Sequence, residues 1–160
     1  MKKPLIAALI AAQLIAVASP ALAVEENNVS NGLTAAGAPL GLHGVDPVAF
    51  VTLGNRIDGT AKFTAVHDGV AYYFTSQENL DTFTANPGRF TPQNGGYCTF
   101  GVSVGKKFDG DPRYAAVVNG KLYVFLNEDI LKAFQKDQAG TISKAATNWR
   151  TIRSVAAAEL

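Results

Sequence analysis

Residues Lys62–Ser76, KFTAVHDGVAYYFTS, decide the fold, because they spell a complete β-hairpin and the start of a helix. Two runs rich in β-branched and aromatic residues, 62–67 and 70–75, flank the dipeptide Asp68-Gly69. An Asp-Gly pair tolerates the positive φ angles of a type I′ turn, the tightest hairpin connection. Ser76 then stands where a helix N-cap is expected. The stretch therefore predicts a strand, a tight turn, a second strand and a helix.

The same pattern returns 51 residues later as Arg113–Asn127, RYAAVVNGKLYVFLN. Aligned with itself at this offset, the chain gives ten identities over residues 54–83 without a gap. Asn119-Gly120 takes the place of the first turn, and Asn127 takes the place of the N-cap. Two copies are too few for a solenoid, so each copy is expected to cover the apolar face of the other.

We therefore predict an α+β fold, in which a duplicated β-hairpin–helix (ββα) unit packs about a pseudo-twofold axis. A last helix is expected over residues 142–157, with its apolar stripe at Ile142, Ala145, Ala146, Trp149 and Ile152. Trp149 is interpreted as a core anchor, and stacking on a ligand is the alternative. The domain is expected over residues 40–160, and the polar, aperiodic residues 24–39 are expected to form a flexible leader.

The first 23 residues have the three parts of a cleavable secretory signal. Lys2 and Lys3 are followed by the apolar run 5–17, and Ala21-Leu22-Ala23 is an A-x-A cleavage site. The run is shorter than the roughly 20 residues that a membrane-spanning helix needs. We expect a periplasmic or secreted protein that does not span a membrane after cleavage.

Charge and motifs exclude two classes of function. The formal charge is +1, and it becomes −1 when Lys2 and Lys3 leave with the signal, which argues against nucleic-acid binding. Residues 101–105 match G-x-S-x-G, but no histidine follows Ser103 to complete a hydrolase triad. We expect a protein that is not an enzyme.

Cys98 is the only cysteine, so no internal disulfide can form. A lone thiol is unusual in the oxidising environment that exported proteins meet. Three interpretations stay open: a buried inert side chain, a metal ligand, or a site of intermolecular pairing.

Several stretches together resemble the YHS domain family in its exported bacterial form. They are 44–50, GVDPVAF; 68–76, DGVAYYFTS; 83–90 with Asn86-Pro87; 95–98, GGYC; 120–123, GKLY; and Trp149. The resemblance covers about residues 42–149 and implies a small α+β fold. It also suggests metal binding, because YHS domains accompany heavy-metal-transporting ATPases. Metal-associated members carry cysteines at two positions that hold Thr75 and Asn79 here.

The candidate site combines two glycine-containing loops that the repeat makes equivalent. At the offset of 51, Gly44 aligns with Gly95, and Asp46-Pro47 aligns with Tyr97-Cys98. Asp46 also suits a helix N-cap with Pro47 as the first helical residue. If the loops meet, imidazole, carboxylate and thiolate could hold a transition metal, with His43, Asp46 and Cys98 as ligands. The lining of such a site would be Tyr97, Gly95 and Gly96.

The sequence leaves three functions open. The first is a non-enzymatic exported module that binds a transition metal ion or a small ligand at this loop pair. The second is an interaction domain that docks on another exported protein and takes no small ligand. The third is a thiol-dependent activity at Cys98, which would need a histidine brought close by the fold.

Overall fold

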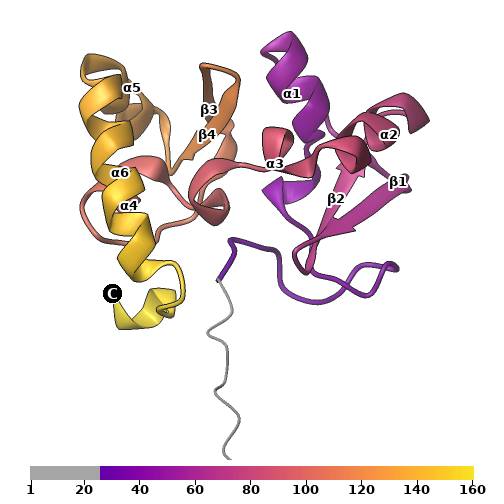
Figure 1. The fold of residues 1–160 in the computed structure, drawn as a ribbon, viewed down its shortest axis with the longest axis horizontal. Helices are drawn as coiled ribbons and strands as arrows, with labels where there is room; N and C mark the ends of the chain where they lie inside the picture. The colour runs from indigo at the N-terminus through magenta and orange to yellow at the C-terminus, as the bar shows by residue number, and fades with distance from the viewer. Residues whose placement is uncertain (1–25) are drawn as a thin grey trace, which may run out of the picture.

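A computed structural model describes residues 26–160 of the chain. The predicted signal, residues 1–23, and the first two residues of the predicted leader lie outside the described residues. The described part is a mixed α+β fold with two small antiparallel sheets and several helices (Figure 1). The fold class is therefore confirmed at this level. None of the helices within residues 26–160 combines the length and apolar character needed to cross a membrane.

The first hairpin pairs β1 (Thr60–His67) with β2 (Val70–Phe74). Asp68 and Gly69 have φ angles of 48° and 76°, which confirms the predicted turn with two positive φ angles. Helix α2 (Gln77–Ala85) follows, and the side chain of Ser76 caps its N-terminus.

The second hairpin pairs β3 (Asp111–Val118) with β4 (Lys121–Phe125). Asn119 and Gly120 again have positive φ angles, 52° and 71°. Helix α5 (Glu128–Lys136) follows, and its N-cap is Asn127, as predicted.

The two hairpins share one register. Thr60 pairs with Phe74 in the first, and Asp111 pairs with Phe125 in the second, 51 residues later. An irregularity follows each of these pairs, between residues 60 and 64 and between residues 111 and 115.

A short turn and a helix precede each hairpin. The 3-10 turn η1 (Leu42–Gly44) leads into α1 (Pro47–Leu53) before β1. The turn η2 (Gln93–Gly96) leads into α4 (Thr99–Ser103) before β3.

The segments after α2 and α5 differ in length. After α2 comes the single turn α3 (Pro87–Phe90), whereas after α5 comes the long helix α6 (Gln138–Ile152), followed by η3 (Ala157–Glu159). The predicted bounds of the last helix, 142–157, were therefore wrong at both ends. The helix starts earlier because Asp137, at its N-cap, accepts a hydrogen bond from the amide of Gly140. Helix α6 lies beside α4 (Figure 1).

Aromatic side chains form the core of each half. The Phe83 ring of α2 lies 5.0 Å from that of Phe74, and the Phe134 ring of α5 lies 4.5 Å from that of Phe125, measured between centroids. Between the halves, Phe50 of α1 belongs to an apolar cluster with residues of β4. The halves are thus joined by buried apolar surface as well as by the chain.

The part of the predicted leader that the structure describes contacts both halves. The amide of Glu26 donates to the carbonyl of Arg153, and the amide of Asn28 donates to the carbonyl of Gly95. The amide of Ser30 donates to the carbonyl of Leu40. In Figure 1 this indigo segment starts between the halves and runs below the first half. Nothing in its polar, aperiodic sequence pointed to these contacts.

Candidate functional site

His43 lies in a backbone turn with unusual dihedral angles. Leu42, His43 and Gly44 have consecutive φ angles of 48°, 50° and 80°. Residues other than glycine seldom adopt this left-handed backbone region, because it costs them roughly 1–2 kcal/mol each. The His43 ring is exposed, and its Nε2 lies 3.1 Å from Oδ1 of Asp109 in the second half. The same oxygen accepts a hydrogen bond from the side-chain amide of Asn28 at 2.8 Å.

Asp46 is a fully buried carboxylate that caps helix α1, which confirms its predicted structural role. Its Oδ1 accepts hydrogen bonds from the amides of Val48 and Ala49 at 2.8 and 3.0 Å. Its Oδ2 accepts from the amide and the hydroxyl of Thr75, both at 2.8 Å. The amide group of Asn79 donates to Oδ2 as well, at 2.7 Å. The carboxylate is therefore occupied by protein donors on both oxygens.

Cys98 is buried in the aromatic core of the second half, with 1% of its surface exposed. It packs in a cluster with Tyr123, Phe125 and Phe134. Burial raises the pKa of its thiol, and this outweighs the backbone amides near the sulfur. Because a thiolate is the reactive and metal-binding form, this environment disfavours both roles.

Asp46 and Cys98 occupy corresponding places in the two halves. Each is the N-cap of the helix after the 3-10 turn, and the Cys98 sulfur accepts from the Gly101 amide at 3.5 Å. A second contact is also shared. Asp46 accepts a hydrogen bond from the amide of Thr75, the residue after β2. The Cys98 sulfur accepts one from the amide of Leu126, the residue after β4.

This correspondence corrects the predicted register of the two loops. At an offset of 51, Asp46 aligned with Tyr97, but the structural offset here is 52. The physical reason is length: α1 spans seven residues and α4 spans five, so the offset falls from 52 at their first residues to 50 at their last. The additional residue Val104 then restores the offset of 51 at Gly54 and Gly105, which both have positive φ angles.

The three predicted metal ligands are not bonded to one another. His43 contacts Asp109, Asp46 binds donors of its own half, and Cys98 lies in the second core. Within residues 26–160, no three His, Cys, Asp or Glu side chains are grouped so that they could hold a metal ion. The metal site stays a prediction without support in this geometry.

Of the three residues predicted to line a ligand, Gly95 lines a cavity. Tyr97 is outside the lining but packs against Trp149, which belongs to it. The Tyr97 and Trp149 rings pack with their centroids 6.3 Å apart. Burial first, and then the charge and hydrogen bond of Glu26, raise the pKa of Tyr97. Gly96 is buried, and its carbonyl accepts from the Asn28 side chain at 3.0 Å.

Lys107 contacts these two rings, the segment at Glu26 and the segment that follows α6. Its ammonium is fully buried, 5.1 Å from the centroid of the Tyr97 ring and 5.3 Å from that of Trp149. It donates to Oε2 of Glu26 at 2.9 Å and to the carbonyls of Arg153 and Val155 at 3.0 and 2.6 Å. All three of its N–H donors are thereby used.

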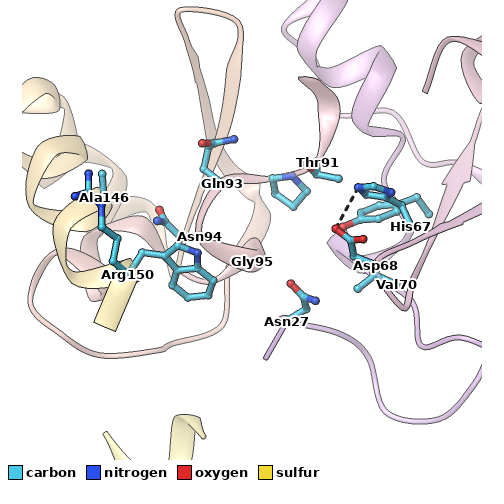
Figure 2. A pocket seen from close by; sticks show the side chains of 13 residues that line it. Asn27, His67, Asp68, Val70, Thr91, Gln93, Asn94, Gly95, Ala146 and Arg150 are labelled. Carbon is cyan, nitrogen blue, oxygen red and sulfur yellow. Dashed lines mark ion pairs between the residues drawn. The ribbon is translucent and has the colours of Figure 1, made fainter. Parts of the chain in front are cut away.

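A cavity of about 430 Å³ has Trp149 in its lining. Figure 2 shows this cavity from close by. One wall is the end of the first hairpin, with His67 and Asp68, and the opposite wall is α6, with Ala146 and Arg150. The linker between the halves, residues 91–95, and Asn27 complete the lining. The volume falls within the 300–1,000 Å³ typical of small-molecule sites.

Sequence reasoning found only part of this cavity. It marked Gly95 as a lining residue and gave ligand stacking as the alternative role of Trp149. It missed Asn27, which lies in the leader, and Arg150, which a helix pattern shows only as a surface cation. Their convergence depends on how the halves pack, and no local motif encodes that.

Comparisons with protein-family models, with curated proteins and with solved structures found no match to this chain.

Proposed function

We propose that this protein is an exported, non-enzymatic binding module that holds a small ligand in the cavity between the first hairpin and α6. The observation that carries the proposal is the cavity itself, in which a half-buried Trp149 lies among polar side chains. Such a mixture of an aromatic surface and a few polar groups is typical of small-molecule sites. Export is supported by the signal-like residues 1–23.

The ring of Trp149 is held in place, as a binding surface requires. Tyr97 and Lys107 support it from within the protein. On another side lies Gly95, where an added Cβ would come within 3.0 Å of the ring. Because Gly95 also has a φ angle of 61°, glycine suits this position on two counts.

The two halves are, in this proposal, copies of one ββα unit related by a pseudo-twofold axis. The shared register, the turn dipeptides, the caps and the correspondence of Asp46 with Cys98 support the duplication. The kinship with YHS domains remains a proposal that rests on the sequence motifs alone.

The proposal is tested with a library of small molecules of varied charge, followed on the indole N–H resonance of Trp149. This chain has one tryptophan, so the signal is unambiguous. We expect some compounds to shift it saturably. Ala146→Phe should abolish these shifts by filling the cavity from the exposed face of α6, whereas Ser143→Phe, on the same helix but outside the lining, should keep them. The proposal fails if no compound binds or if Ala146→Phe has no effect.

A second candidate function is docking on another exported protein. Exposed apolar side chains lie at or after the ends of α1 and α4, at positions 51 residues apart: Leu53 and Ile57 in one half, and Val104 and Phe108 in the other. Cross-linking in an extract of exported proteins tests this candidate. Phe108→Ser should remove a specific adduct, and Leu33→Ser, at an exposed leucine elsewhere, should keep it.

A further inference from the structure

The cavity contains one cation that has no partner among the described residues. Within residues 26–160, the guanidinium of Arg150 makes no hydrogen bond or ion pair, and Arg150 belongs to the part of the cavity lining that α6 provides (Figure 2). By contrast, Arg113 pairs with Asp111, and Lys107 pairs with Glu26. Arg150 is therefore available to a ligand.

The side chains of His67 and Asp68, on the opposite wall, contact each other. Nε2 of His67 lies 3.3 Å from Oδ2 of Asp68, as the dashed line in Figure 2 marks. Asp68 also points largely into solvent, with 83% of its side chain exposed. These two residues, Arg150 and Tyr72 are the titratable groups of the lining, and burial, followed by the charge of Asp68, raises the pKa of Tyr72. The charged side chain of the lining that has no partner within the described residues is thus Arg150, on the α6 wall.

Neutral polar groups and an aromatic ring make up the rest of the recognition surface. The side-chain amides of Asn27 and Gln93 line the cavity and make no hydrogen bond within the described part of the chain. The adjacent Trp149 offers an apolar surface one residue before Arg150. A cavity lined by both an arginine and an aromatic ring suits a ligand that is charged at one end and flat at the other, because the planar fork of a guanidinium matches a carboxylate.

We propose that the ligand is a small organic carboxylate with a planar apolar body, which places its carboxylate on Arg150 and its body against Trp149. This inference rests on the proposed function, since it names the chemical class that the same cavity takes.

A matched series of three probes tests the class: 3-phenylpropionate, 3-phenylpropanol and 3-phenylpropylamine. They share one body and differ in charge. We expect the acid to shift the Trp149 indole resonance most strongly and the amine least. Arg150→Gln should weaken the acid roughly tenfold or more, the usual effect of losing a charge-assisted hydrogen bond. Lys144→Gln, an equal charge change on α6 outside the lining, should leave it unchanged.

The outcomes separate this inference from the proposed function. If library compounds bind but the acid binds no better than the alcohol or the amine, the carboxylate class is wrong and the site stands. The same holds if Arg150→Gln and Lys144→Gln weaken the acid equally. If neither the series nor the library shifts the resonance, the binding function itself is wrong.

Discussion

Replacing Asp46 with alanine should strongly destabilise the first half. The side chain is fully buried and accepts five hydrogen bonds, two from the first turn of α1 and three from Thr75 and Asn79. Losing an N-cap costs about 1 kcal/mol. Each of the three other bonds, whose donors are half-buried, contributes about 1 kcal/mol net. We expect a loss of about 4 kcal/mol in the free energy of unfolding.

Asp46→Asn separates the contributions of the two carboxylate oxygens. The remaining oxygen can still cap α1, but the new amide group would face the three donors on Thr75 and Asn79. We expect a loss of about 3 kcal/mol. Urea unfolding at neutral pH measures both variants, with Asp81→Ala, an exposed acid on α2, as the control that should change by less than about 0.5 kcal/mol. A loss below about 1.5 kcal/mol for Asp46→Ala would refute the argument.

Three further predictions concern Glu26, Cys98 and His43. Glu26→Gln should lower stability at neutral pH by about 1–2 kcal/mol, because it weakens the bond to the buried Lys107. Burial alone would raise the pKa of Glu26, but hydrogen bonds from Lys107 and other groups lower it overall, so urea midpoints of the two proteins should converge as the pH falls below about 4.5. The Cys98 thiol should react with a disulfide reagent roughly a hundredfold slower or more in the native protein than in urea, and equal rates would contradict its burial. His43→Ala should be about 1 kcal/mol less stable than His43→Gly in urea titrations, because both lose the bond to Asp109 but only alanine keeps the cost of the positive φ angle. Equal stability would show that the turn relaxes.

Local chemistry made the hairpins and caps predictable. Asp68-Gly69 and Asn119-Gly120 need no tertiary partner to favour a turn with two positive φ angles, and Ser76 and Asn127 act on amides only three residues away. The contacts that form the site have a longer range. His43 meets Asp109 across 66 residues, and Asn28 meets the same carboxylate across 81.

The alignment of the repeats misled the site prediction for a related reason. An offset that fits the hairpins does not have to fit the segments before them, because helix length can change without altering a strand register. With the structural offset of 52, Asp46 and Cys98 occupy equivalent positions, one in each half. The sequence prediction had instead treated them as two ligands of one metal site. Leu126 and Ile130 stand where the first half has Thr75 and Asn79. The second half therefore surrounds its cap with apolar groups, and a thiol tolerates that environment better than a carboxylate does.

The position of the cavity follows from the one element that the halves do not share. The caps Asn86 and Asp137 have nearly equal dihedral angles, with φ of −153° and −149°, so the chain leaves α2 and α5 in the same way. After Asn86 it makes only the turn α3 and enters the second half, whereas after Asp137 it continues as the long α6. Trp149 and Arg150 belong to the last turns of that helix and have no counterpart after α2. Two similar halves would otherwise present similar surfaces at their seam, so the added helix gives one side of the seam an aromatic ring and a cation.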